Sequence, residues 1–560
     1  MKNPEFFKRR IMGLVSYFPD IDELLPKYDK NVNFKIQYID MSMEQFSIYE
    51  KARVQERKIE LNNARKRGAA NKKGDVYEEA VSTYRIFSRA FCNFVFPKDI
   101  IRPLPGNIKN LSERIAIEEL ENASKIEDSL EIVDNTEQSK DDDHESPVDE
   151  SYAEKIVAAL KKLKDNKELY LTPDGELKNL SPKFLNILLN INDPKHYGLH
   201  LVYSQFRILE GIGILALVLE ANGYAQFKIR KVKNEWRLDI SEKDITKPKF
   251  VLYTGTENAK EKEIVRNIFN SNWDKIPENL KKDIEDLERK IEESKKSEDL
   301  EESEKSEKSE DLEKSEKSEK SEKNLYGNII KVFMITASGA EGISLNNVRY
   351  VHITEPYWHP VRIDQVIGRA RRICSHSKLE PQYSTVDVFL YLMKFTKAQL
   401  DDEKSIELKT KDLSKLEKGR VYTSDQTLYE ISQIKESCNK SILHNIKEAS
   451  IDCNIHKKIG NKENLQCLTF HSITKDDFSY IPSYIDQNKN LDLDENKTKQ
   501  KLKLKTVGNP PKYAVNMANT TNEKELYSLE SAKSSNPIQI GILHFKDSKV
   551  ERIELFGEKK

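Results

Sequence analysis

The amino-acid sequence predicts an α/β fold with a parallel sheet flanked by helices. Short apolar runs of strand length alternate with segments of helical length between residues 199 and 392. This alternation is typical of βαβ units, whose strands run parallel. Charged residues make up 33% of the 560 residues and hydrophobic residues only 37%. We therefore expect a packed core in part of the chain and much solvated or disordered sequence elsewhere.

The predicted elements follow one another in a regular order. A strand at Leu199–Ser204 leads into a long apolar helix from about Ile208, which Gly223 ends. The next elements are a strand at Phe250–Tyr253, a helix at Glu257–Phe269, a strand at Lys331–Thr336, a further strand, a helix around Gln365, and a strand at Thr385–Leu392. A strand at Phe34–Ile39 and a charged helix from Glu44 precede them as an accessory piece.

One helix carries the most informative pattern of the chain. Gln365, Gly368, Arg369 and Arg372 follow a spacing of i, i+3, i+4 and i+7, which places them on one helical face. Two guanidinium groups on one face suit the oxygens of a polyphosphate, because their geometry matches phosphate and they do not deprotonate. Arg371 lies off this face and should contact another group.

The segment QVIGRARR around these residues resembles motif VI of superfamily 2 helicases, and SGAEGISL at 338–345 is similar to their motif V. Both motifs belong to the second RecA-like lobe. The resemblance implies that Arg372 is an arginine finger, that Arg369 joins it on the γ-phosphate of ATP, and that Gln365 and Gly368 support the ATP cleft.

The same resemblance implies a set of nucleic-acid contacts. The motif V residues would begin a helix whose backbone N–H groups and hydroxyl bind a phosphate. YSQF at 203–206 resembles motif IV, at the carboxyl end of a strand, where open α/β sheets bind ligands. Phe206 could equally be a core residue. The implied nucleic-acid-binding residues are Ser338, Gly342, Ser344, Ser204 and Gln205.

The flanking sequences resemble a narrower group. Segments at 8–18, 88–97 and 371–376 look like the helicases and early-transcription-factor ATPases of large nucleocytoplasmic DNA viruses, and the similarity runs from about Arg9 to Cys453. The resemblance implies DNA or RNA as partner, viral RNA polymerase as a possible one, and a place inside the cell, in the virion or the host cytoplasm.

A complete helicase also needs a phosphate-binding loop and a DExx box, yet the sequence contains neither Gly-Lys-Thr nor Gly-Lys-Ser. ATP and Mg²⁺ would then be held mainly by a lobe on another polypeptide, because phosphoryl transfer depends on that loop and the metal. A split gene, a truncated copy and a deliberately divided enzyme remain open explanations. The leading hypothesis is the second lobe of an ATP-dependent helicase or translocase in viral transcription. The alternative is a non-catalytic subunit that binds nucleic acid or a transcription complex.

Composition suggests five segments. They are a linker or accessory region at 1–110, an acidic disordered linker at 111–150, the RecA-like lobe at 151–400 with a disordered Ser-Glu-Lys insertion at 290–324, a helical extension at 401–470, and a polar tail at 471–560 with a hairpin at 538–545 and 550–556. Lys and Arg number 93 against 94 Asp and Glu, so the chain has no overall positive charge, and binding to phosphates must depend on local basic residues. A basic loop at 65–73 could touch a nucleic-acid backbone.

Five cysteines and no apolar run of membrane-spanning length indicate a soluble protein, away from membranes, with reduced thiols. Cys453, His456, Cys467 and His471 have a spacing that a zinc site can use, although the turn glycines usual at such pairs are missing. We favour no metal there. Phe91, Phe94 and Phe96 could stack on bases, but their alternation favours a buried strand.

Overall fold

The computed structural model describes residues 3–17, 24–69, 85–104, 150–254, 258–303, 324–336, 342–402, 411–453, 465–468, 504–507, 513–516, 523–529, 539–546 and 549–556. The chain forms two compact units, Asp20–Ser437 and a second made of Met1–Pro19 and Cys438–Lys560. Several predictions fall outside the described residues: the acidic linker, the Ser-Glu-Lys repeats at 304–323, Ser338, His456 and His471. The side chains of the basic loop at 65–73 lie outside them as well.

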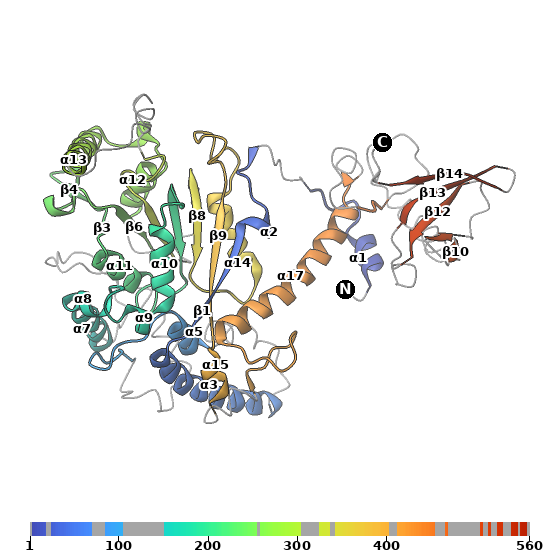
Figure 1. The fold of residues 1–560 in the computed structure, drawn as a ribbon, viewed down its shortest axis with the longest axis horizontal. Helices are drawn as coiled ribbons and strands as arrows, with labels where there is room; N and C mark the ends of the chain where they lie inside the picture. Colours follow the sequence, from blue (N-terminus) through green and yellow to red (C-terminus); the bar gives the residue numbers. More distant parts are fainter. Residues whose placement is uncertain are drawn as a thin grey trace. The chain divides into compact units, whose positions relative to one another are not determined.

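A seven-stranded sheet forms the centre of the larger unit (Figure 1). Its order is β1-β9-β8-β2-β7-β6-β3, and every neighbouring pair is parallel. The strands are β1 (Phe34–Asp40), β2 (Leu199–Tyr203), β3 (Ala225–Gln226), β6 (Lys249–Tyr253), β7 (Val332–Ile335), β8 (Val348–Ile353) and β9 (Asp387–Lys394). All residues of β2, β7 and β8 are buried, as expected for strands covered on both faces. The predicted α/β fold is confirmed.

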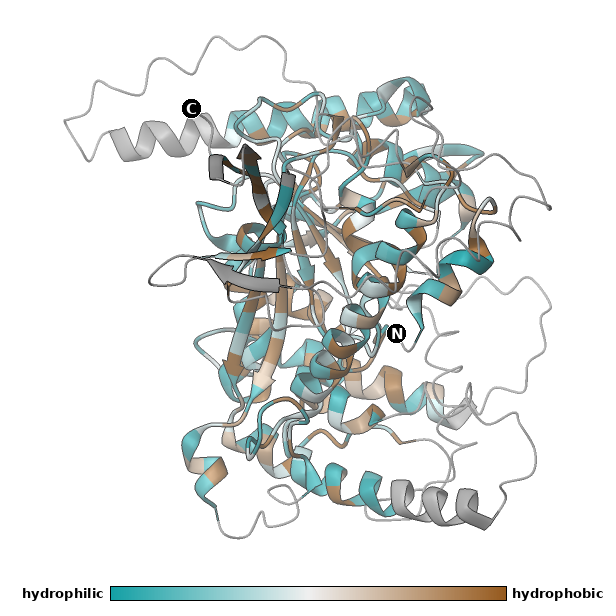
Figure 2. Ribbon diagram, turned by 90° about the vertical axis from the view of Figure 1, so that its right-hand side faces the viewer, coloured by the Kyte–Doolittle hydropathy of each residue, from teal (hydrophilic) through white to brown (hydrophobic). Residues whose placement is uncertain are grey.

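Successive residues of each central strand enter two different cores. In β2, for example, Leu201 joins one hydrophobic cluster and Val202 the other. The cluster of Val202 is closed by α3 (Met43–Ala69), α5 (Ile86–Asn93), α7 (Glu150–Asp165), α10 (Pro182–Asn192) and α11 (Ile212–Ala221). The cluster of Leu201 is closed by α12 (Ala259–Phe269), α13 (Glu278–Ser303) and α14 (Pro360–Ala370). Figure 2 shows the hydrophobic residues concentrated on the strands between these layers.

Shorter elements connect this framework. They are α2 (Lys30–Asn33), α8 (Lys167–Tyr170), α9 (Leu177–Leu180), a hairpin of β4 (Ile229–Val232) and β5 (Glu235–Leu238), short helices at Glu242–Asp244 and Trp273–Lys275, and α15 (Lys397–Asp401). The helix α17 (Ser424–Glu448) follows the loop after α15. No helix in the described part of the chain is long and apolar enough to cross a membrane.

Two predictions about the N-terminal region need correction. The strand at Phe34 was assigned to an accessory piece at 1–110, but β1 pairs with β9 throughout its length and is a strand of the lobe sheet. The pairing joins residues more than 350 positions apart, so local sequence gives no sign of it. Phe91, Phe94 and Phe96 are buried as predicted, but Phe91 lies in the helix α5 and the other two follow that helix.

The smaller unit contains α1 (Pro4–Ile11) and a five-stranded antiparallel meander. Its strands are β10 (Leu504–Val507), β11 (Tyr513–Asn516), β12 (Glu523–Ser528), β13 (Gln539–Lys546) and β14 (Lys549–Leu555). Val515, Leu526 and Leu543 form its core. The predicted C-terminal hairpin corresponds to β13 and β14, whereas the three preceding strands were missed because their apolar residues are sparse.

The structure differs from the prediction of reduced thiols. Cys453 and Cys467 form a disulfide with 5.6 Å between their Cα atoms. The sulfur atoms are therefore bonded to each other rather than available as thiolate ligands for zinc. The two cysteines lie 14 positions apart in the sequence. Cys92, Cys374 and Cys438 are free.

Candidate functional site

The loops after β2 and β8 meet at one edge of the sheet because these two strands are adjacent and parallel. The loop after β2 begins at Ser204, and the loop after β8 contains Glu355, whereas residues 342–347 lead directly into β8 and so lie at the amino end of that strand. Open parallel sheets bind ligands outside the carboxyl ends of their strands. Ser204 and Gln205 lie at this edge, whereas Ser344 lies just before β8, beside the C-terminal end of α14.

The helix α14 presents the residues of the QVIGRARR segment. Its N-cap, His359, is extended, and Pro360 occupies the first turn, where a missing N–H costs no intrahelical bond. Ile363, Val366, Ile367 and Ala370 are buried at helical spacing and pack on the sheet. The opposite face consequently carries the polar residues Gln365 and Arg369.

The predicted helical face is wrong in one respect, because α14 ends at Ala370 and Arg372 lies beyond it. Arg371 leaves the helical conformation with φ −100° and ψ 84°, and Cys374 has a positive φ of 58°. The hydroxyl of Ser375 donates to the carbonyl of Ala370 at 3.1 Å and accepts from the backbone N–H of Arg372 at 3.3 Å. This turn folds Arg372 back toward the helix.

An open hollow of about 580 Å³ brings the four residues together nonetheless. Gln365, Gly368, Arg369 and Arg372 line it, with Leu25, Arg371 and Ile373. A Cβ atom at Gly368 would meet nothing within 4 Å, so packing does not require a glycine there. Arg371 lines the hollow as well, and its guanidinium lies 5.8 Å from the ring centroid of Tyr28, a contact outside the predicted set.

The two arginines of the predicted finger share one acceptor. Arg369 Nη1 donates to the carbonyl of Ile343 at 3.3 Å, and Arg372 Nη2 donates to the same carbonyl at 3.0 Å. The backbone N–H of Leu345 in turn donates to the carbonyl of Arg369 at 3.1 Å. The segment after β7 is thus fastened to the end of α14.

Asn270, the C-cap of α12, fastens the same segment from the other side. Its Nδ2 donates to the carbonyl of Ser344 at 2.9 Å, and its Oδ1 accepts from the N–H of Asn346 at 2.8 Å. The asparagine is only 4% exposed. The sequence reasoning missed this residue, since an asparagine at a helix end is usually just a cap.

The described residues 342–347 form a turn and a bend that lead directly into β8, so the helix predicted to start at Gly342 and Ser344 is not found among them. The proximity of β8 leaves no room for one. Gly342 has a positive φ of 70° and is exposed, and Ser344 is half-buried. A side chain at position 342 would be strained by the backbone conformation, which favours glycine.

The residues predicted after β2 are occupied with a buried carboxylate. Ser204 is 1% exposed, and its hydroxyl contacts both carboxylate oxygens of Glu355 at 3.0 and 3.1 Å. The backbone N–H of Gln205 and the Nδ2 of Asn93 also donate to that carboxylate. Burial raises the pKa of Glu355, while these donors oppose the shift. An acidic residue two positions after an all-buried strand was the signal available for Glu355.

A cluster of aromatic and basic side chains follows Glu355 and was also missed. Tyr357, Trp358 and His359 contact one another with ring centroids 4.7 to 5.9 Å apart, and all three are half-buried. The ammonium of Lys435 lies 3.5 Å from the Trp358 ring centroid, and the guanidinium of Arg362 lies 4.5 Å from that of Tyr357. Burial lowers the pKa of His359, and the charges of Arg362 and Lys435 lower it further.

Comparison with known families addresses the segment from α13 to the turn after α14. Residues 279–374 match the model of the helicase conserved C-terminal domain. The chain carries a helicase C-terminal domain. The match includes Gly342, Ser344, Gln365, Arg369 and Arg372.

Proteins similar to this helicase-domain chain come from large DNA viruses. It is 26% identical over 501 residues to a protein named as an ATP-dependent RNA helicase of Acanthamoeba polyphaga mimivirus, covering 81% of this chain and 47% of that protein. It is 24% identical over 482 residues to a termination factor NPH-I homolog of African swine fever virus, with coverage of 82% and 51%. Nucleoside triphosphatase I of Melanoplus sanguinipes entomopoxvirus is 34% identical over 138 residues, 23% of this chain and 21% of that protein. The chain spans about half the length of the first two relatives.

Proposed function

We propose that this chain acts as the second lobe of an ATP-dependent helicase or translocase that works on DNA or RNA during viral transcription. The observation that carries the proposal is the convergence of Arg369 and Arg372 in one open hollow with Gln365 and Gly368. The names of the viral relatives, an RNA helicase and a termination factor, support this class of activity and this setting.

The hollow fits a polyphosphate. Three arginines line it, and the space above Gly368 is open for a ligand to approach the helix. Arg372 rests on the neutral carbonyl of Ile343, and a phosphate oxygen is a stronger acceptor for a guanidinium because it is charged. When ATP and Mg²⁺ are held by a lobe with the phosphate-binding loop, Arg372 would stabilise charge on the γ-phosphate and Arg369 would hold it in place. Gln365 would orient the same phosphate.

The same contacts suggest how nucleotide and nucleic acid affect each other. Arg369 and Arg372 both hold the Ile343 carbonyl, which lies between Gly342 and Ser344. If Arg372 turns to a phosphate, this carbonyl loses a donor and the segment loses part of its attachment. Gly342 and Ser344 are the described motif V residues proposed to bind a nucleic-acid phosphate. Movement of one arginine would therefore alter the nucleic-acid contact.

Trp358 and Lys435 would add a second nucleic-acid contact. An aromatic ring can stack on a base and an ammonium can pair with a phosphate, without dependence on base sequence.

The test measures nucleic-acid-stimulated ATPase of the full chain combined with a polypeptide that carries the Gly-Lys-Thr lobe. Arg372→Ala should lower kcat by about a thousandfold, which is the lower range for arginine fingers. Arg289→Ala is the matched control, because the Arg289 side chain is 64% exposed on α13 and pairs with Asp286 three residues earlier. Trp358→Ala should raise the nucleic-acid concentration needed for half-stimulation, with little change in kcat.

Two outcomes would contradict the proposal. One is an active mixture in which Arg372→Ala behaves like Arg289→Ala. The other is an inert mixture in which the chain alone binds nucleic acid with or without Arg372, as expected for a non-catalytic binding subunit.

A further inference from the structure

A second cavity lies beside β1, an edge strand of the seven-stranded sheet, away from the site residues described above. It has a volume of about 170 Å³. Its walls come from β1, β9, the loop at 411–422 and the first turns of α17, all within the larger unit. None of the helicase motifs contributes a residue to it. Its chemistry therefore needs a separate explanation.

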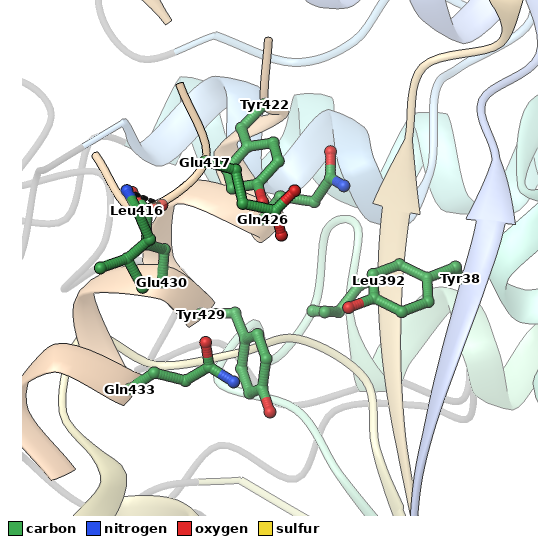
Figure 3. Close-up of a pocket in the computed structure, with 9 residues that line it drawn as sticks. All are labelled: Tyr38, Leu392, Leu416, Glu417, Tyr422, Gln426, Tyr429, Glu430 and Gln433. Atoms are coloured by element: carbon green, nitrogen blue, oxygen red, sulfur yellow. Dashed lines mark hydrogen bonds between the residues drawn. The ribbon is translucent and has the colours of Figure 1, made fainter. Parts of the chain in front are cut away.

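Aromatic rings form much of the wall. In Figure 3, Tyr38, Tyr422 and Tyr429 face the space from three sides. Burial raises the pKa of all three phenols, so the rings are neutral at physiological pH. Neutral phenol rings present a negative π-face, which attracts cations. Leu392 and Leu416 supply apolar surface beside them.

The charged groups in the wall are carboxylates. Glu430 accepts from the Ser414 hydroxyl and from the N–H groups of Lys415 and Leu416, at 2.9 and 3.0 Å for the latter two. Burial works against its charge, but these donors outweigh burial and lower the pKa of Glu430. Its carboxylate is therefore ionised and fixes the loop. Glu417 adds a second carboxylate, 2.6 Å from the exposed guanidinium of Arg420.

No lysine, arginine or histidine is among the described residues that line this cavity. Two carboxylates would repel a phosphate group, which makes a nucleotide a poor occupant. Carbonyl oxygens of Gln426 and Gln433 can accept further N–H donors. A long side chain with an apolar stem and a cationic end matches every wall, since its stem can lie on Leu392 and Leu416 while its head meets the rings and carboxylates.

We propose that this cavity receives an arginine or lysine side chain from a partner protein, and that the face formed by β1 and the loop at 411–422 is a protein-docking surface. The surroundings suit such a surface: Leu416, which lines the cavity, is 59% exposed, and Leu413 on the same loop is 44% exposed. This site is independent of the ATP hollow, so a failure of the proposed helicase function leaves it standing.

The experiment uses the full chain and the probe peptide acetyl-Gly-Arg-Gly-amide, observed by saturation-transfer NMR. The matching peptide with citrulline has the same shape without the charge. Irradiation of the wild-type chain should transfer saturation to the methylene protons of the arginine peptide and not to those of the citrulline peptide. Tyr38→Leu and Glu417→Gln should each weaken binding about fivefold, the loss expected for one cation–aromatic or charge contact.

Two control variants match these changes elsewhere on the same unit. Tyr197→Leu removes a tyrosine that is 50% exposed, against 52% for Tyr38. Glu235→Gln removes a carboxylate that is 52% exposed and pairs with Arg237, much as Glu417 pairs with Arg420. Both controls should bind the arginine peptide like the wild type. Thermal unfolding checks that all four variants are folded.

The proposal is overturned if citrulline and arginine peptides bind alike, or if Tyr38→Leu and Glu417→Gln bind like their controls. It is also overturned if the wild-type chain transfers saturation to adenosine monophosphate and the Tyr38→Leu variant does not, since the cavity would then hold a base. Should Tyr38→Leu unfold, Glu417→Gln decides the matter because it keeps the size of the side chain.

Discussion

Replacement of Asn270 tests whether motif V is held in place by side chains of its neighbours. The asparagine makes one hydrogen bond to the Ser344 carbonyl and one from the Asn346 N–H. Each hydrogen bond contributes about 1 kcal/mol net to stability, and a buried backbone group left without a hydrogen-bond partner costs about 1–3 kcal/mol. Ser344 and Asn346 are half-buried and regain some water. Asn270→Ala should therefore loosen the segment by about 2 kcal/mol, or roughly thirtyfold in local opening.

Hydrogen exchange followed by mass spectrometry measures this opening directly. Peptides that cover residues 342–347 should exchange about thirtyfold faster in Asn270→Ala, while peptides from β2 should keep their rate. Asn166→Ala is the control, because Asn166 is exposed and its side chain donates to the Lys162 carbonyl one turn away on its own helix. Asn270→Asp should be at least as damaging as alanine, since a carboxylate would face the Ser344 carbonyl with no donor. Unchanged exchange in Asn270→Ala would refute the reasoning.

Two further predictions concern the scaffold and the hollow. Asp412 accepts from Arg53, Arg57 and Arg85, all buried, so Asp412→Ala should cost about 3–5 kcal/mol in urea unfolding at pH 7. Burial works against its charge, but the guanidiniums lower the pKa of Asp412. Its contribution is thus present above the ordinary value of about 4 and is lost as pH falls through the lower folded value, so the difference between wild type and variant should shrink as the pH falls below about 4. Equal stabilities at pH 7 would contradict this. Gly368→Ala should leave the melting temperature unchanged or slightly raised, because its Cβ meets nothing and alanine favours helix by about 1 kcal/mol, while ATPase of the assembled enzyme falls. Full ATPase would show that the hollow above Gly368 is not used.

The sequence was sufficient for features that depend on local pattern. Alternating strands and helices predicted the parallel sheet, and the spacing of Gln365, Gly368 and Arg369 predicted their common face, because helical periodicity is local. Arg372 departs from that face for reasons that lie later in the chain. Ser375 caps the helix and Cys374 adopts a positive φ. A pattern of seven residues contains neither fact.

Long-range pairing explains the other differences. β1 joins the lobe sheet through β9, and Asn270 reaches motif V from a helix more than 70 residues earlier. The cavity at Tyr38 combines that strand with α17, which follows it by nearly 400 positions. Each of these features depends on contacts between distant segments, whereas local sequence patterns predict the order of the elements and not their pairing.

Charged groups of the lobe differ in how easily they can change partners, and the difference lies in their burial. Glu355 is held by Ser204, Gln205 and Asn93, and Asp425 by the Lys183 ammonium at 2.6 Å. Breaking such a contact leaves a buried charge without compensation, which costs several kcal/mol, so these groups stay fixed. Arg372 differs, because its guanidinium is half-exposed and rests on a neutral carbonyl. If a phosphate oxygen replaces that carbonyl as the acceptor, no buried charge is left without a partner. Among these charged groups, Arg372 is therefore the one whose partner a nucleotide can replace at least cost.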